Sequence, residues 1–166
     1  QMLVISSLAK SFGAPLASLS GSAAWIEHFA ERSTTRVHCS PPSVADLHAA
    51  TSALDQNHRH GDRLRRQLAQ RVQYFRRRLA ALGLATTGGL FPVQTIRPIA
   101  ALGARAMYEQ LLRRGVRTVL RKSRHGPDAL VSFVITARHT QAEIDQAIQA
   151  LQQIAPGAPQ PAREAG

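Results

Sequence analysis

The sequence has little of what stabilises small secreted proteins or spans a membrane. Cysteine occurs once, at Cys39, which excludes an internal disulfide and favours a reducing compartment. No apolar run approaches the length of a transmembrane helix, and no charged segment followed by an apolar one stands at the start. We therefore expect a cytoplasmic location.

Acidic and aromatic residues are also scarce. Asp and Glu number 10 against 21 Lys and Arg, which gives a formal net charge of +11, and aromatic residues make up 5% of the chain. This positive charge favours phosphate-bearing ligands as a class. The 166 residues are 44% hydrophobic, which is enough for one domain with a core.

The most informative stretch runs from Leu3 to Gly13. It begins with a short apolar run and continues with serines, one lysine and a final glycine. Met2–Ile5 predicts a buried strand, and open α/β sheets place their ligands at strand ends. Lys10 follows this strand, and we expect it at the mouth of a pocket, where partial burial makes an amine nucleophilic toward carbonyls. The hydroxyls of Ser7 and Ser11 are placed to hold an anionic group. The pattern describes a Schiff-base lysine with a phosphate nearby.

Two other interpretations of the same lysine remain. Ser7 and Lys10 have the S-x-x-K spacing of a serine nucleophile, but that motif normally opens a helix and is accompanied by S-D-N and K-T-G elements, which do not occur here. A solvated loop lysine is the other alternative. We favour the cofactor role.

The segment Ser7-Leu8-Ala9-Lys10-Ser11-Phe12-Gly13 resembles the cofactor-lysine segment of fold type I pyridoxal-phosphate (PLP) enzymes. The nearest group is the α-oxoamine synthases, which include 8-amino-7-oxononanoate synthase, among the relatives of class I and II aminotransferases. The resemblance continues through Ser40-Pro41-Pro42 and Thr136-Ala137-Arg138-His139 to about Ile154.

This resemblance implies an α/β fold, the C-terminal part of the fold type I PLP-transferase fold. Residues 1–42 would form the end of the large-domain sheet, 43–83 a long linking helix, and 84–155 a small C-terminal α/β domain. Residues 156–166, rich in proline and poor in apolar side chains, predict a disordered tail. Family members are more than twice this long, so we expect a missing N-terminal half, which would carry the phosphate loop and the groups around the cofactor ring.

The resemblance also implies roles for individual residues. Lys10 would bind PLP and move the α-proton of the substrate, and Ser7 would bind the cofactor phosphate. His38 falls where the family has a threonine that reaches the phosphate of the neighbouring subunit. Ser40 or Thr35 could substitute for it, and a structural loop histidine is the alternative.

The substrate carboxylate is the point where the sequence departs from the family. The family binds this group with an arginine, whose place here is taken by Ser132. Arg121, which matches another family arginine, could take over, with Arg124 and Arg138 as weaker candidates. A surface role is the alternative for each. Without the family arginine, the enzyme could lack the usual carboxylate-binding residue, it could catalyse transamination, or it could have lost activity.

Hydrophobic periodicity predicts the remaining elements. A core helix over 23–32 would bury Trp25, Ile26 and Phe29, and Gly61 is a possible break in the long helix. The small domain is expected to contain strands at 90–97, 116–120 and 130–136, a helix at 100–114, and a final helix that begins with the capping box Thr140-Gln141-Ala142-Glu143.

Three functions follow, in order of preference. The first is a PLP-dependent transferase that condenses an amino acid with an acyl-CoA or other acyl thioester, in a homodimer and without a metal. The second is a PLP-dependent aminotransferase. The third is a nucleic-acid-binding module built on the arginine-rich face of the long helix, which the lack of stacking aromatics disfavours.

Overall fold

A computed structural model describes residues 2–34, 40–96, 102–122 and 129–154. The chain divides into two compact units, residues 1–62 (unit 1) and residues 63–166 (unit 2). In the described ranges, no helix has both the length and the apolar composition needed to cross a bilayer. The domain boundaries expected after residues 42 and 83 stay a prediction, and the expected tail lies outside the described residues.

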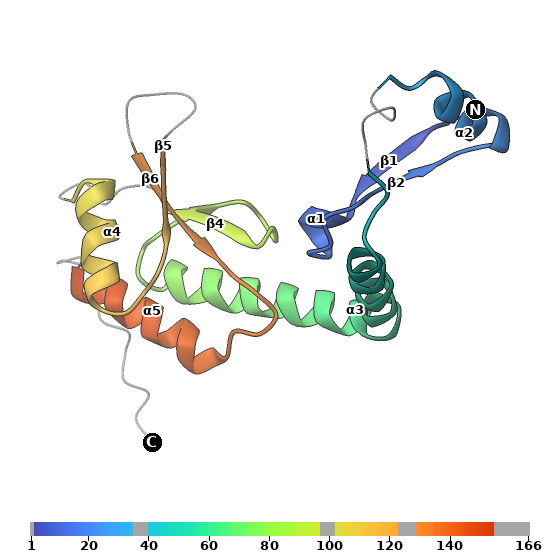
Figure 1. Cartoon of the computed structure of the whole chain (residues 1–166). Helices are drawn as coiled ribbons and strands as arrows, with labels where there is room; N and C mark the ends of the chain where they lie inside the picture. Colours follow the sequence, from blue (N-terminus) through green and yellow to red (C-terminus); the bar gives the residue numbers. More distant parts are fainter. Residues whose placement is uncertain (1, 35–39, 97–101, 123–128, 155–166) are drawn as a thin grey trace. The chain divides into compact units, whose positions relative to one another are not determined.

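Unit 1 begins with a β-hairpin whose connection contains a short helix. Strand β1 (Val4–Ser7) pairs antiparallel with β2 (Ala17–Ser20), and α1 (Leu8–Ser11) lies between them (Figure 1). Helix α2 (Ala23–Arg32) follows, with the predicted bounds. The sequence predicted β1, although this strand begins and ends two residues later than expected, and it did not predict α1.

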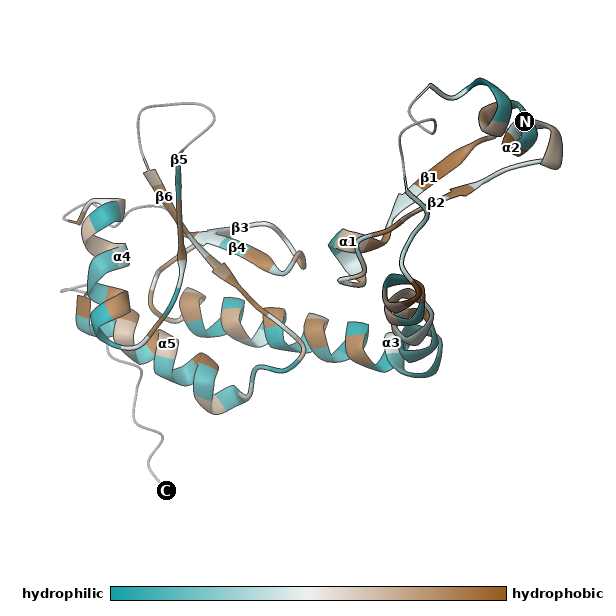
Figure 2. Ribbon diagram, viewed as in Figure 1, coloured by the Kyte–Doolittle hydropathy of each residue, from teal (hydrophilic) through white to brown (hydrophobic). Residues whose placement is uncertain are grey.

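Unit 1 has very little core of its own. Its described residues include only three buried ones, Ala14, Ala50 and Gly61. The prediction that α2 is a core helix is wrong for this chain, because Trp25 and Phe29 are 42% and 39% exposed. A two-stranded sheet offers no surface broad enough to cover them. Figure 2 likewise shows hydrophobic residues in β1, and those residues are exposed.

Helix α3 (Val44–Ala80) is the longest element. It begins as predicted at Ser43, whose Oγ accepts a hydrogen bond from the backbone N–H of Asp46 at 3.1 Å. The helix does not divide at Gly61, and the boundary between the two units falls just after that glycine. It ends at Ala80, and the turn that follows closes at Gly83, whose φ of +70° is the left-handed conformation that favours glycine after a helix.

Unit 2 contains a four-stranded antiparallel sheet. Its strands are β3 (Thr86–Thr87), β4 (Val93–Ile96), β5 (Val119–Lys122) and β6 (Ala129–Val134), in the order β3-β4-β6-β5. The last three match predicted strands with shifted bounds. The two-residue β3 was not predicted, because so short a strand carries no periodicity.

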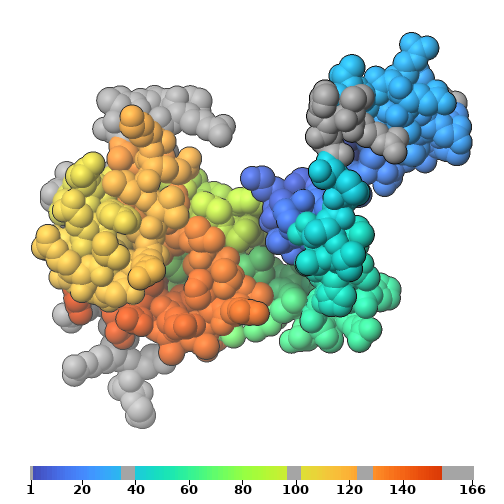
Figure 3. All heavy atoms as spheres, viewed as in Figure 1, coloured from blue at the N-terminus to red at the C-terminus, as the bar shows by residue number. Residues whose placement is uncertain are grey.

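The helices of unit 2 cover one face of this sheet. Helices α4 (Ala104–Arg113) and α5 (Gln141–Ile154) pack against each other, as Figure 3 shows in yellow and orange-red, and the second part of α3 joins them (Figure 1). The core residues that these elements share include Val72, Phe75, Leu79, Met107, Leu111, Val131, Phe133, Ile148 and Leu151. Unit 2 therefore has the hydrophobic core that unit 1 lacks.

No helix in the described part of unit 2 packs on the opposite face of the sheet. Val131 and Phe133 of β6 point into the helix-side core, so the residue between them, Ser132, lies on the open face. Strand register places Thr95 and Val119 opposite Ser132 on this face. We call this surface the open face.

The predicted capping box at the start of α5 is confirmed. The backbone N–H of Thr140 donates to Glu143 Oε2 at 2.7 Å, and the backbone N–H of Glu143 donates to Thr140 Oγ1 at 3.2 Å. The hydrogen bonds from the Thr140 backbone and side chain lower the pKa of Glu143 below its usual 4.5.

We expect Glu143→Gln to lower the melting temperature at about pH 7 but much less at about pH 3. A carboxylate with a lowered pKa adds stability above its unfolded-state pKa of 4.5, and this stability is lost as the pH falls through the lower folded-state value. Thermal melts monitored by circular dichroism would measure the difference. Glu109→Gln, on an exposed position of α4, is the matched control. An equal loss for Glu143→Gln at both pH values would contradict this account.

Candidate active site

The hairpin of unit 1 places Lys10 directly beyond the end of a strand. The β1–β2 ladder ends at the pair Ser7 and Ala17, and α1 starts at the next residue. The backbone N–H of Leu8 donates to the Leu16 carbonyl at 2.8 Å, which closes the base of the connection. Lys10 lies in the single turn of α1, at the position relative to the strand that the sequence predicted.

The immediate surroundings of Lys10 differ from the expectation. Lys10, Ser7 and Ser11 are all exposed, whereas Lys10 was predicted to be partly buried at a pocket mouth. That prediction is wrong for this chain by itself. The described part of unit 1 supplies one hairpin, the helices α1 and α2, and the first part of α3, and Lys10 is exposed among them.

The short helix also bears on the alternative of a serine nucleophile. Ser7 is the N-cap residue of α1 and stands three residues before Lys10, so the S-x-x-K segment does open a helix, as that motif requires. The side chain of Ser7 makes no capping hydrogen bond to α1, which leaves its hydroxyl available to a ligand. The companion motifs of that alternative are still missing from the sequence.

The second group of predicted cofactor contacts is only partly described. His38, Thr35 and Cys39 lie outside the described residues. Ser40 is described and exposed, in the extended segment before Pro41. Its role in phosphate binding stays a prediction.

The predicted substrate residue Arg121 belongs to a polar cluster on the open face of unit 2. Its Nε donates to Ser132 Oγ at 3.3 Å, and its Nη2 donates to Thr95 Oγ1 at 3.2 Å. The two hydroxyls are also hydrogen-bonded to each other, with 2.9 Å between Thr95 Oγ1 and Ser132 Oγ. The structure therefore brings together Arg121 and the serine that stands at the family's arginine position.

Thr95 is the member of this cluster that sequence reasoning missed. It lies 26 residues before Arg121 along the chain and comes near it only through the β4-β6-β5 strand register. A sequence pattern does not fix that register. Of the weaker candidates, Arg138 is exposed and Arg124 lies outside the described residues.

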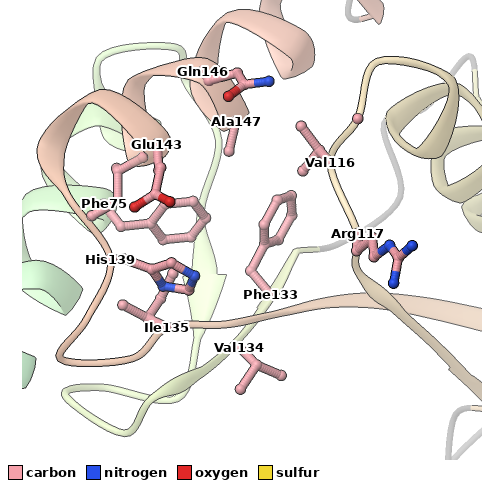
Figure 4. Close-up of a pocket in the computed structure, with 12 residues that line it drawn as sticks. Phe75, Val116, Arg117, Phe133, Val134, Ile135, His139, Glu143, Gln146 and Ala147 are labelled. Atoms are coloured by element: carbon pink, nitrogen blue, oxygen red, sulfur yellow. The ribbon is translucent and has the colours of Figure 1, made fainter.

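A separate surface cavity of about 340 Å³ lies near the start of α5 (Figure 4). Figure 4 shows the rings of Phe75 and Phe133 at its centre, with their centroids 5.1 Å apart, and Glu143 and His139 near them. His139 accepts a hydrogen bond from the Thr136 backbone N–H through Nδ1 at 3.0 Å. None of the predicted site residues that the structure describes lines this cavity.

Some arginines of α3 have partners inside unit 2. Arg76 donates through Nη1 to Gln94 Oε1 at 3.1 Å, and the Gln94 side chain is fully buried. Arg78 Nε lies 3.3 Å from Asp145 Oδ1, and Asp145 also accepts a hydrogen bond from the Tyr74 hydroxyl. These two arginines tie α3 to the sheet and to α5, which weakens the interpretation of the helix as a continuous nucleic-acid-binding face.

Comparison with known proteins gives matches over most of the chain. A family model described as Aminotransferase class I and II matches residues 1–151. A curated protein of Acaryochloris marina named for 8-amino-7-oxononanoate synthase is 30% identical over 168 residues, which cover 95% of this chain and 42% of that protein.

Two solved structures show the likeness in three dimensions. The 8-amino-7-oxononanoate synthase of Francisella tularensis matches with a TM-score of 0.74 and 20% identity, over 92% of this chain and 45% of that one. A structure of serine palmitoyltransferase (SPT) with PLP matches with a TM-score of 0.76 and 16% identity, over 91% and 39%. At these identities the likeness concerns the fold. The chain spans less than half the length of the relatives it matches.

Proposed function

Because this chain belongs to the class I and II aminotransferase family, we propose that it is the lysine-bearing part of a PLP-dependent transferase related to the α-oxoamine synthases. The predicted family and fold, part of a fold type I PLP enzyme, are confirmed by the family match and the two structures. The reaction that we propose is the condensation of an amino acid with an acyl thioester.

The observation that carries this proposal is the arrangement of Ser7 and Lys10. An amine and a hydroxyl that makes no capping hydrogen bond stand within one helical turn, directly beyond a strand end. A cofactor with an aldehyde and a phosphate needs a nucleophilic amine and hydrogen-bond donors for the phosphate oxygens. These two residues fit those requirements.

Bound PLP supplies an electron sink that stabilises negative charge at the α-carbon of an attached amino acid. In this proposal, the amine of Lys10 holds the cofactor and afterwards takes the α-proton of the substrate. The Ser7 hydroxyl donates a hydrogen bond to the cofactor phosphate, with Ser40 and His38 as further candidates. Arg121 binds the carboxylate of the amino acid.

The proposed enzyme needs residues that enclose Lys10, and this chain does not supply them. Its relatives are more than twice as long, and we propose that the missing N-terminal half supplies the walls around Lys10. The exposed apolar residues of unit 1, among them Ile5 and Trp25, are a surface on which such a half would pack. A homodimer and a cytoplasmic location stay predictions.

An absorbance spectrum of the chain with PLP, followed by borohydride reduction and peptide mapping, tests the proposal. Lysine occurs only at positions 10 and 122, so the map has two possible sites of attachment. We expect the reduced adduct at Lys10. If the chain alone gives none, the measurement is repeated with the N-terminal half added, and a second absence would reject the cofactor role.

Each of the two alternative functions can be tested by a specific experiment. An aminotransferase would convert an amino acid to its oxo acid without an acyl thioester, and product analysis separates that reaction from condensation. A nucleic-acid-binding module would bind oligonucleotides with an affinity that falls steeply with salt, and it would show no cofactor absorbance.

A further inference from the structure

The cavity at the start of α5 has an apolar inner wall. Its volume is about 340 Å³, and every residue that lines it belongs to unit 2. Phe133, Ile135 and Ile144 are 4%, 5% and 3% exposed. Val116 and Ala147, which also line the cavity, are partly buried. A flat apolar ring placed against this wall would remove its surface from water at a favourable free energy.

Two polar groups at the rim are held in place by the backbone beside them. The capping box uses only Oε2 of Glu143, so Oε1 accepts no hydrogen bond from a described residue. The backbone N–H of Thr136 donates to Nδ1 of His139, which places the proton of the neutral imidazole on Nε2. The rim therefore offers one fixed acceptor and one fixed donor, which lose little side-chain entropy when a ligand binds.

The Glu143 carboxylate requires a ligand group that donates. The hydrogen bonds from Thr140 lower the pKa of Glu143, so the carboxylate is ionised at neutral pH and can only accept. The His139 Nε2–H requires an acceptor. Adenine is a flat ring system that has both groups side by side, because its amino group donates and the neighbouring ring nitrogen accepts.

Arg117 supplies a cation on the other side of the cavity. Figure 4 shows it across the two phenylalanine rings from Glu143 and His139. Arg117 is exposed, and it forms no hydrogen bond or ion pair with another residue in the described ranges. A guanidinium with all its N–H groups available is well suited to bind a phosphate.

We infer that this cavity is a binding site for an adenine nucleotide. The base lies against the apolar wall, its amino group donates to Glu143 Oε1, a ring nitrogen accepts from His139 Nε2–H, and the phosphate binds Arg117. The site contains none of the residues proposed to bind the cofactor or the amino acid. The inference therefore goes beyond the proposed function and does not depend on it.

The test is a calorimetric titration of the full chain with adenosine monophosphate (AMP). In parallel, ¹³C-labelled isoleucine methyl groups locate the bound nucleotide by NMR. We expect saturable binding that shifts the methyl signals of Ile135 and Ile144, which line the cavity, because the ring current of a stacked base acts at short range. The signal of Ile96 on β4, outside the cavity, should not move.

Two ligands that each change one part of the nucleotide test the assigned contacts. Adenosine lacks the phosphate and should bind about tenfold more weakly than AMP, because a hydrogen bond between two charged groups is lost. Inosine monophosphate (IMP) keeps the ribose and the phosphate but has a carbonyl oxygen in place of the amino group. It should also bind about tenfold more weakly, since that oxygen cannot donate to Glu143.

Three variants connect these preferences to single side chains. Arg117→Gln should remove the preference for AMP over adenosine, and Glu143→Gln should remove the preference for AMP over IMP. His139→Asn keeps an acceptor for the Thr136 N–H but lacks the Nε2 donor, and it should weaken AMP binding by about tenfold. Arg113→Gln, on an exposed residue of α4 outside the cavity, removes the same charge and should keep the Kd within about twofold.

Several results would overturn the inference. These are an absence of saturable AMP binding, binding that leaves Ile135 and Ile144 unshifted, and preferences that persist in Arg117→Gln and Glu143→Gln. Coenzyme A carries the same base on a longer molecule. If it bound more tightly than AMP, the cavity would belong to an acyl donor of the proposed transferase, and the assignment to a separate nucleotide site would be wrong.

Discussion

Replacing Lys10 with alanine is expected to abolish the PLP adduct that borohydride fixes to the protein. The amine of Lys10 is the proposed nucleophile, and alanine leaves no group at that position able to form the covalent bond. Intact mass after reduction measures the adduct, and peptide mapping locates it. Because Lys10 is exposed and makes no described contact with a core residue, we expect the thermal melt to change little.

The matched control is Lys122→Ala, since position 122 holds the only other lysine. Lys122 is exposed at the end of β5, and its removal should leave the adduct intact. An adduct that persists in Lys10→Ala, or that falls by the same amount in both variants, would indicate nonspecific modification of surface amines. Ser7→Ala should keep the adduct but raise the PLP concentration needed to form it.

Truncating Phe75 to alanine is expected to lower the free energy of unfolding of unit 2 by about 3–5 kcal/mol. Phe75 is fully buried on α3, and its ring lies 5.1 Å from the ring of Phe133 on β6. The substitution removes a large apolar side chain and leaves a cavity where the helix meets the sheet. A loss of this size is a large fraction of the stability of a small domain.

Urea unfolding would measure the effect, with a separate probe for each unit. Tyr74 and Tyr108 are the only tyrosines and both lie in unit 2, whereas the single tryptophan, Trp25, lies in unit 1. Phe91→Ala is the control, because Phe91 is 64% exposed and its truncation should cost less than about 0.5 kcal/mol. Equal effects of the two substitutions would contradict the assignment of the core.

The sequence predicted the helices of this chain better than their environments. The bounds of α2 and the capped start of α5 agree with the structure, because periodicity and capping residues are local signals. The exposure of Trp25 was not predicted, because burial depends on which surfaces are present to cover a helix. Strand β3 was missed for a local reason, since two residues carry no pattern.

In the candidate site, too, local sequence signals predicted individual residues but not their tertiary surroundings. Lys10 could be singled out because a short motif and a strand end coincide in sequence, and Arg121 because it matches a family arginine. The association of Arg121 with Thr95 and Ser132 required the order β4-β6-β5, which brings distant residues to one face. Strand order is set by tertiary packing, so a single sequence could not predict this cluster.

The small number of buried residues in unit 1 has a consequence for how the protein can be studied. Local opening costs little free energy where few apolar contacts are broken, so the amides of β1 and β2 should exchange with deuterium much faster than those of β4 and β6. Protection at β1 is then a sensitive reporter of binding. A cofactor or a polypeptide that covers Lys10 and α2 would slow this exchange by mass action, and the effect could be followed without a catalytic assay.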